Sequence, residues 1–284
     1  MRRPRLSSAS PPASPAPEAA LARSRYALAL YYGQDALPLL TRYQRVVVQP
    51  GHFSDRQVGW LRQRGVQVLA YLSLGEDGSG EDQEWLTPEP PTLWKTRLVN
   101  VSHPAWRARI QAQVLRQKSV FNGFFLDTLD SATRDPRQLR AMLKLVRLVR
   151  QWAGPKYLLT NRGIGLLHRL RGTVNGVLIE AFSTTWQPGE DQTSGGPAGY
   201  RAYTKPELEY TAHLLGQVRR QGLEVFALDY ADTAQLRRFA LRRAASFNLS
   251  TFVSNRELNL PTGYTPPSTR AAKTARSRGG SLSH

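Results

Sequence analysis

Six short apolar runs of this chain each end at a polar or acidic residue that is followed by residues typical of loops. The runs are VVVQP (46–50), VLAYLSLGED (68–77), GFFLDTLDS (123–131), YLLTNRG (157–163), GVLIEAFS (176–183) and VFALDYAD (225–232). A parallel strand that is buried on both faces reads as a continuous apolar run, and its first polar residue marks where it leaves the sheet. Parallel strands that end in this way bring their polar residues to one rim, which is how (β/α)8 barrels build their active sites.

The order of the predicted elements favours such a barrel. Strands are predicted over 26–33, 45–50, 66–75, 122–130, 156–161, 176–183, 223–230 and 247–254. Helices are predicted between most of them, over 54–65, 104–118, 136–152, 164–172, 206–222 and 232–245. Alternation of strands and helices predicts an α/β fold with a parallel sheet. We therefore expect a (β/α)8 TIM barrel over residues 26–264, close to the ~250 residues that this fold uses. A doubly wound open sheet is the alternative.

Three connections depart from a regular barrel. No helical pattern follows the last predicted strand, so the eighth helix is expected to be atypical or missing, and residues 17–25 are a candidate to cover that strand. Two long loops, over about 76–102 and 184–205, follow the third and sixth strands, and the first contains a possible extra strand at 98–102. Long loops without regular structure are often functional.

The charge of the chain is distributed unevenly. The net charge is +18, and residues 1–25 hold five Arg against one Glu, while residues 265–284 hold three Arg and one Lys. Both ends are rich in Pro, Ala and Ser and are predicted to be disordered. Other basic residues recur on predicted helices. The acidic residues that follow predicted strands instead suggest an acidic rim; they are Glu76, Asp77, Glu81, Asp82, Glu84, Asp127, Asp130, Glu180, Glu190, Asp191, Asp229 and Asp232.

Several classes of chemistry lack their sequence signals. The chain has no cysteine, which excludes disulfides and thiolate metal sites, and its five histidines show no metal-ligand spacing. There is no G-x-S-x-G elbow or P-loop, and no lysine ends a predicted strand. No apolar run reaches the ~18–20 residues of a membrane span, and the amino terminus lacks the apolar core of a signal peptide. We therefore expect no metal, no cofactor and no membrane span.

Two carboxyl groups are the candidates for catalysis. Asp127 and Glu180 each end an apolar strand, and their strands are two apart in the predicted barrel. Hydrolysis of a glycosidic bond needs a pair of carboxyl groups that flank the bond, one of them protonated. Burial beside Phe125 and Phe182 would raise the pKa of one carboxyl group relative to the other. The structural alternative is that Asp127 caps the following helix and Glu180 forms a buried salt bridge.

Other residues at the strand ends are candidates for substrate contact. Aromatic rings suit the apolar faces of sugars, and polar side chains suit their hydroxyl groups. Each of these residues also has a structural alternative, namely packing for the aromatic residues and helix capping for Asp130. The aromatic candidates are Tyr31, Tyr32, Tyr71, Phe182, Trp186 and Tyr230, and the polar candidates are Glu76, Asp130, Asn161, Arg162 and Asp229.

Taken together, the strand-end motifs resemble those of the endo-α-1,4-polygalactosaminidase family of glycoside hydrolases. The resemblance is carried by YYG (31–33), AYLSLGE (70–76), GFFLDTLD (123–130), LLTNRG (158–163), LIE (178–180), LDYAD (228–232) and FVSNREL (252–258). It implies a barrel hydrolase that acts on galactosamine-containing polysaccharide without a cofactor. It also implies that Asp127 is the nucleophile and Glu180 the acid/base. The family suggests an extracellular or cell-envelope location, although no signal peptide is visible.

Two other functions remain open from the sequence. A barrel of this kind could bind carbohydrate without cleaving it, or, as the less favoured alternative, the Arg-rich ends could bind nucleic acid. The expected partner is therefore a polysaccharide substrate. The oligomeric state has no sequence signal.

Overall fold

A computed structural model of the chain describes residues 26–133, 135–188 and 199–261. The predicted tails at 1–25 and 265–284 lie outside these ranges, as do Glu190 and Asp191. Eight strands form one parallel sheet. They are β1 (Tyr26–Tyr31), β2 (Tyr43–Val48), β3 (Gln67–Ser73), β6 (Gly123–Asp127), β7 (Tyr157–Asn161), β8 (Gly176–Glu180), β11 (Glu224–Tyr230) and β12 (Ser250–Ser254).

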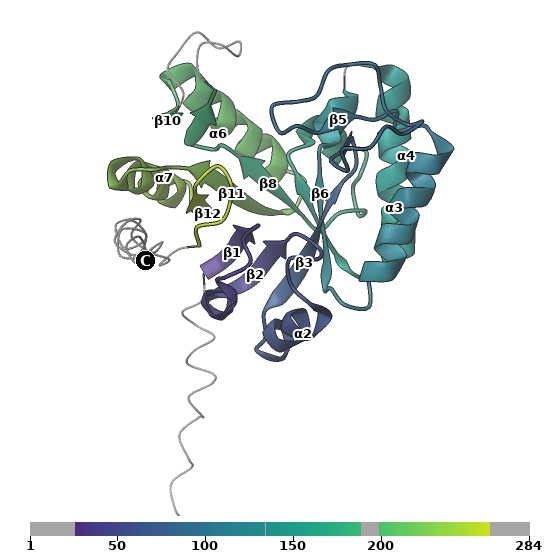
Figure 1. The fold of residues 1–284 in the computed structure, drawn as a ribbon. Helices are drawn as coiled ribbons and strands as arrows, with labels where there is room; N and C mark the ends of the chain where they lie inside the picture. Colours follow the sequence, from purple (N-terminus) through teal and green to yellow (C-terminus); the bar gives the residue numbers. More distant parts are fainter. Residues whose placement is uncertain (1–25, 134, 189–198, 262–284) are drawn as a thin grey trace, which may run out of the picture.

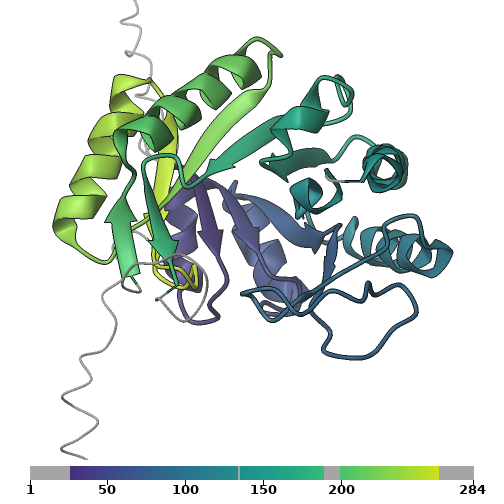
Figure 2. The same ribbon diagram turned by 90° about the horizontal axis from the view of Figure 1, so that it is seen from above.

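The sheet curls into a nearly closed barrel, which confirms the predicted fold. Its strands follow the order β1-β2-β3-β6-β7-β8-β11-β12, and every pairing in the ladder is parallel. Among the described residues no ladder joins β12 to β1. Instead, the backbone N–H of Tyr32 donates to the carbonyl of Leu258 at 2.8 Å, and the ring of Tyr43 packs on that of Phe252. Figure 2 shows the strands inside a layer of helices.

The helices vary in length around the barrel (Figure 1). The segment between β1 and β2 holds only the short 3-10 helix η2, and α5 between β7 and β8 is a single turn. No helix follows β12 within residues 255–261, as expected for the eighth position. The helices are η2 (Leu37–Arg42), α2 (Asp55–Gln63), α3 (Pro104–Gln117), η3 (Leu129–Ala132), α4 (Pro136–Ala153), α5 (Ile164–Leu167), α6 (Lys205–Arg219) and α7 (Ala234–Ser246).

Local sequence signals explain where the main helices begin. The side chain of Ser54 accepts from the N–H of Gln57 to cap α2, and Asp135 caps α4 directly before Pro136 at its first position. Helix α4 then buries a stripe of apolar side chains against the sheet: Met142, Leu143, Leu145, Val146 and Val149. None of the described helices is long and apolar enough to cross a membrane.

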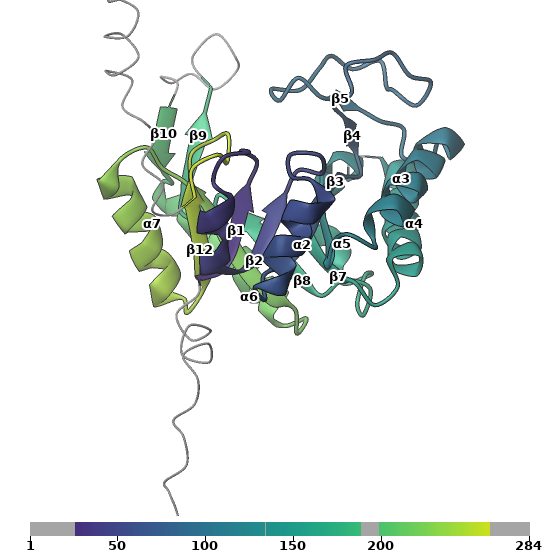
Figure 3. The ribbon, with the colours of Figure 1, turned by 60° about the horizontal axis from the view of Figure 1, so that its bottom comes forward.

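Two short hairpins extend the barrel at the end where the strands terminate. The strands β4 (Glu76–Asp77) and β5 (Arg97–Leu98) pair antiparallel in the first long loop. The extra strand expected at 98–102 is thus shorter and ends at Leu98, followed by an isolated bridge at Val99. The second hairpin, β9 (Thr184–Gln187) and β10 (Gly199–Ala202), occupies the segment expected to be a loop. Figure 3 shows both hairpins at the same end of the barrel, on opposite sides of its mouth.

Candidate active site

A cavity of about 630 Å³ opens beside the first of these hairpins, at the carboxyl ends of the strands. Its walls come from alternate residues of the strands, since side chains two positions apart share one face of a strand. The strand pairs that line it are Tyr71 with Ser73, Phe125 with Asp127, and Leu228 with Tyr230. Further lining comes from Leu30, Tyr32, Gln49, Glu76, Gly78, Trp94, Thr96, Thr128, Asn161, Glu180, Arg256, Glu257 and Leu258.

The carboxyl groups of Asp127 and Glu180 face each other across one amide. The side-chain nitrogen of Asn161 donates to Oδ1 of Asp127 at 2.9 Å and to Oε2 of Glu180 at 2.6 Å. The two carboxylate oxygens therefore lie no farther apart than the sum of these distances. The structure brings together the pair that the sequence proposed, with Asn161 between its members.

Other hydrogen-bond donors fix each carboxyl group. The Tyr71 hydroxyl donates to Oδ2 of Asp127 at 2.8 Å, and the backbone N–H of Thr128 donates to Oδ1 at 2.7 Å. The hydroxyl of Tyr230 donates to Oε1 of Glu180 at 2.6 Å. Asp127 thus accepts three hydrogen bonds and Glu180 accepts two from the described residues. The three donors to Asp127 favour its ionised form.

Burial acts in the opposite direction on Asp127. Removal from water, followed by the nearby charge of Glu180, raises the pKa of Asp127 to about 6. Burial and the carboxylate of Asp127 also raise the pKa of Tyr71 well above its usual range. Tyr71 therefore stays protonated and keeps donating to Asp127, whose own carboxyl group titrates near pH 6.

The chain turns sharply directly after each of the three central residues. Thr128, Arg162 and Ala181 follow Asp127, Asn161 and Glu180, and their φ angles are 64°, 47° and 52°. This left-handed region is costly for residues with a β-carbon, above all for a β-branched threonine. Three such turns, each directly after one of the hydrogen-bonded residues Asp127, Asn161 and Glu180, indicate strain that the surrounding structure maintains at a functional site.

Four of the residues expected to contact substrate line this cavity in addition to Asn161: Tyr32, Tyr71, Glu76 and Tyr230. The edge of Tyr32 meets the Tyr71 ring at a centroid distance of 5.5 Å, and Glu76 accepts from the Thr96 hydroxyl at 2.5 Å. Arg162 and Trp186 line a smaller cavity of about 280 Å³ beside the first. The guanidinium of Arg162 donates to the backbone carbonyl of Glu180.

Three other candidates lie in the core, which corrects their expected contact with substrate. Tyr31 and Phe182 are fully buried on the outer face of the barrel wall, where they pack on Phe53 and Phe247. Asp229 is also fully buried, and its Oδ1 accepts from the N–H groups of Ser183 and Thr184 at 2.5 and 2.9 Å. Burial raises the pKa of Asp229 to about 6.

Asp130 is the fourth candidate that lines neither cavity. It is exposed, and its Oδ2 accepts from the N–H of Gly163 at 3.3 Å. Its side chain ties the turn after β6 to the turn after β7, so the structure assigns it a structural contact.

Sequence reasoning missed several residues of the cavity, notably Trp94, Thr96, Arg256 and Glu257. Trp94 and Thr96 lie in the first long loop, whose length was the available signal. Arg256 and Glu257 fall within FVSNREL (252–258), which follows the last strand. Within the described ranges, no group of three or more acidic or histidine side chains could hold a metal ion.

A parallel barrel with paired carboxyl groups at the carboxyl ends of its strands defines the class of TIM-barrel glycoside hydrolases. The model of glycoside-hydrolase family GH114 matches residues 6–271, and the chain belongs to that family. The protein is therefore a glycoside hydrolase. A search of curated proteins found no match.

Solved structures of similar fold agree with this family. The glycoside hydrolase domain of PelA from Pseudomonas aeruginosa is 24% identical with a TM-score of 0.73, over 82% of this chain and 96% of that chain. A variant of that domain is 25% identical with a TM-score of 0.72 over the same shares. Ega3 from Aspergillus fumigatus, determined in complex with galactosamine, is 13% identical with a TM-score of 0.62, over 83% of this chain and 92% of that chain.

Proposed function

We propose that this protein is an endo-acting hydrolase of α-linked galactosamine-containing polysaccharide, of α-1,4 specificity, and that it retains the anomeric configuration. The observation that carries the proposal is the single amide of Asn161 bound to both Asp127 and Glu180. Carboxyl groups ~5–5.5 Å apart suit a retaining enzyme, whereas inverting enzymes need ~6.5–9.5 Å to admit a water. The shared donor places the two bonded oxygens no more than 5.5 Å apart, the sum of its 2.9 and 2.6 Å hydrogen bonds, which supports retention over inversion.

In this mechanism Asp127 attacks the anomeric carbon and Glu180 protonates the oxygen of the leaving sugar. The three donors to Asp127 hold its carboxylate in one orientation, since attack requires a fixed and ionised oxygen. Glu180 then removes a proton from the water that attacks the glycosyl–Asp127 ester, which regenerates both groups. Asn161 is a positioning residue because it fixes the separation of the two groups.

The charges of the large cavity support an amino sugar as substrate. Glu76 and Glu257 line it together with the two central carboxyl groups, and Arg256 is the one basic side chain among its described lining residues. An ammonium group is favoured near several carboxylates in a partly buried site. The likeness of fold to Ega3, which was solved with galactosamine, is consistent with this substrate.

The test is digestion of α-1,4-linked galactosamine oligomers and their N-acetylated forms, with products identified by mass. We expect internal cleavage by the wild type, products that first appear as the α-anomer by NMR, and a loss of at least ~10³-fold in Asp127→Asn and Glu180→Gln. Glu224→Gln, at the opposite end of the neighbouring strand β11, is the matched control and should retain activity. Initial release of the β-anomer would contradict retention.

The same assay separates the two alternatives retained from the sequence. Binding of the oligomers without turnover by the wild type would indicate a carbohydrate-binding barrel. Full activity of Asp127→Asn would place the reaction at another centre. The nucleic-acid hypothesis would require salt-dependent binding that disappears when both basic ends are removed.

A further inference from the structure

The smaller cavity is joined to the larger one by shared walls. Trp94, Glu180, Tyr230 and Arg256 line both cavities, whereas Asp127 lines only the larger. Of the two central carboxyl groups, Glu180 alone therefore borders both spaces. A group that protonates the oxygen between two sugars must stand where their two binding spaces meet.

A cation–π stack forms the boundary between the cavities. The Arg256 guanidinium lies 3.7 Å from the centre of the Trp186 ring and 4.5 Å from that of the Trp94 ring. Its Nη2 donates to the carbonyl of Leu93, and its backbone N–H donates to the hydroxyl of Tyr200. Arg256 thereby links the segment after β12 to the loops on both sides of the mouth.

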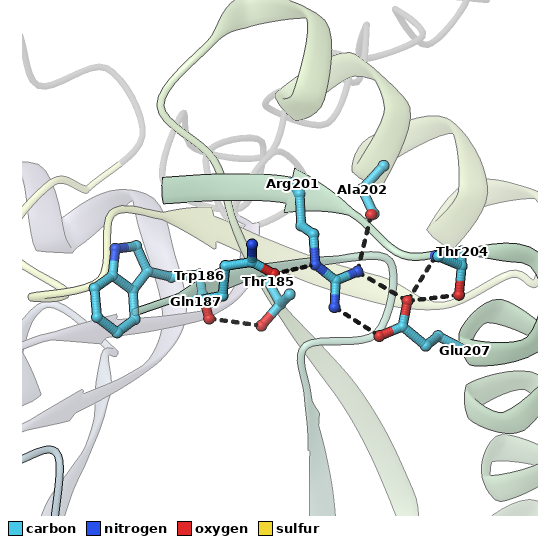
Figure 4. Close-up of polar contacts among 7 residues, drawn as sticks. All are labelled: Thr185, Trp186, Gln187, Arg201, Ala202, Thr204 and Glu207. Atoms are coloured by element: carbon cyan, nitrogen blue, oxygen red, sulfur yellow. Dashed lines mark hydrogen bonds and ion pairs between the residues drawn. The ribbon is translucent and has the colours of Figure 1, made fainter. Parts of the chain in front are cut away.

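The hairpin that carries Trp186 is anchored firmly. Arg201 of β10 forms a bidentate ion pair with Glu207 of α6 at 2.7 and 2.8 Å, and its Nε donates to Gln187 at 2.6 Å. Figure 4 shows this network running from Gln187 through Arg201 to Glu207, with the indole of Trp186 extending away from it. The network therefore holds the hairpin in place, while the stacked Arg256 guanidinium contacts the indole itself as a wall of the smaller cavity.

The two cavities differ in charge. The larger is lined by four carboxyl groups and one guanidinium. The smaller is lined by the guanidinium groups of Arg162 and Arg256, with Glu180 as its one acidic side chain among the described residues. No carboxylate in those residues forms a salt bridge with either arginine. The smaller space therefore disfavours a second ammonium group.

We propose that the smaller cavity is the leaving-group subsite and that it takes a sugar without a free amine, such as an N-acetylated one. The proposal rests on the function proposed above and specifies the substrate pattern: a free amino sugar occupies the larger cavity and a neutral sugar occupies the smaller. The Trp186 ring offers an apolar face to that neutral sugar. The enzyme then cleaves partly acetylated chains at linkages in which a free amino sugar is followed, towards the reducing end, by an N-acetylated one.

Limited digestion of a partly N-acetylated α-1,4-galactosamine polymer tests this pattern. Tandem mass spectrometry of the fragments identifies the sugar at each new non-reducing end. We expect N-acetylated sugars there several-fold in excess of their share in the polymer, and a smaller excess with Arg256→Gln. The control is Arg64→Gln, whose guanidinium stacks at 3.8 Å on Trp60 at the outer helix α2. New ends that match the polymer composition, or an excess unchanged by Arg256→Gln, would overturn the proposal.

A second measurement distinguishes the loss of this subsite from a general loss of activity caused by a disturbed structure. α-Galactosaminyl fluoride fills only the larger cavity, because fluoride leaves without needing a sugar subsite. Trp186→Ala should lose about tenfold in kcat/KM on oligosaccharides and keep its rate on the fluoride. Equal losses on both substrates would reject the assignment. A wild type that hydrolyses neither substrate would instead refute the proposed function itself, and the subsite with it.

Discussion

At the scale of single residues, the site is defined by two carboxyl groups that share one amide donor. Asp127 is held by three donors, yet burial and the charge of Glu180 raise its pKa to about 6. The shared amide of Asn161 keeps the two groups close, and closeness is what makes their titrations interact. The short distance between the two groups therefore contributes to the raised pKa of Asp127.

The acidic limb of the pH profile follows from this pKa. In the proposed mechanism attack requires ionised Asp127, so we expect kcat/KM to fall as the pH drops below about 6. In Glu180→Gln the neighbouring charge is absent, which lowers the pKa of Asp127. With α-galactosaminyl fluoride, which needs no acid, the midpoint of that variant should move to lower pH. An unchanged or raised midpoint would show that Glu180 does not influence Asp127.

The same pKa predicts an effect on stability. The folded protein binds a proton at Asp127 more tightly than the unfolded chain does, because the pKa is raised from 3.8 to about 6. Stability contributed by this group is therefore present below pH 3.8 and is lost as the pH rises through about 6. Asp127→Asn removes the buried charge and should raise the free energy of unfolding at pH 8 by ~1–3 kcal/mol.

Denaturant unfolding at pH 4 and pH 8 measures this effect. The advantage of Asp127→Asn should shrink towards pH 4, where the wild-type carboxyl is largely protonated. The buried Asp229, whose pKa is also raised, is present in both proteins and cancels in the comparison. A variant that is less stable than the wild type at pH 8 would contradict the expectation.

At the scale of elements, the strands supply the site through alternation. Leu30 and Tyr32 face the cavity on β1 and its end, while Tyr31 between them faces outwards. On β11, Tyr230 faces the cavity and the preceding Asp229 faces outwards. Asp229 there binds the backbone of Ser183 and Thr184, so it supports the segment that follows Glu180 without entering the cavity.

The turn after β3 is packed tightly against the turn that follows Asp127. A β-carbon at Gly75 would lie 1.9 Å from the Ser131 hydroxyl oxygen and 2.5 Å from the Thr128 backbone oxygen. Because the latter is backbone, it cannot rotate away. Gly75→Ala should therefore cost ~1–3 kcal/mol of stability and displace Asp127, with a fall in kcat/KM of at least about tenfold.

Gly216→Ala is the matched control for that substitution. Gly216 lies within helix α6, where an added β-carbon meets only the Arg220 side chain at 3.8 Å. Alanine in a helix interior is favoured over glycine, so this variant should be as active as the wild type and more stable by ~0.5–1 kcal/mol. Chemical denaturation and initial rates measure both variants. Equal behaviour of the two would mean that crowding at Gly75 is unimportant.

The sequence predicted the bounds of these elements well, but it did not predict which of their side chains face the cavity. The strand ends, α2, α3, α4, α6 and α7 lie within a few residues of their expected positions, because apolar runs and capping residues are local signals. The outward facing of Tyr31, Phe182 and Asp229 was not predictable. These strands are buried on both faces, so polarity does not alternate and gives no indication of which side faces the cavity.

At the scale of the whole molecule, a strongly basic chain surrounds an acidic cavity. The net charge is +18, while the larger cavity is lined by four carboxyl groups. The acidic rim expected from sequence is only partly a binding surface, because Asp77 is buried, accepts from the Trp85 indole at 2.9 Å and pairs with Arg109. A cationic polymer thus meets repulsion at long range and attraction within the mouth.

A change in ionic strength should separate the long-range repulsion from the short-range attraction. The Debye length falls from ~30 Å at ~0.01 M to ~8 Å at ~0.15 M ionic strength. Over that range the net charge is screened more than the nearby carboxylates, so kcat/KM on fully deacetylated oligomers should rise several-fold. An oligomer in which a single sugar carries a free amine, and whose charge is therefore small, should show a smaller change. A steady decrease for the cationic oligomer would show that long-range repulsion is unimportant.

The sequence by itself determined the barrel, its strand ends and the two carboxyl groups, because these depend on apolar runs that end at polar residues. Only the tertiary structure decided that Asn161 joins Asp127 to Glu180. It also decided that Trp94, Trp186 and Arg256 meet across the mouth. Those contacts join loops that are far apart in the chain, and no local pattern of residues specifies which side chains will meet there.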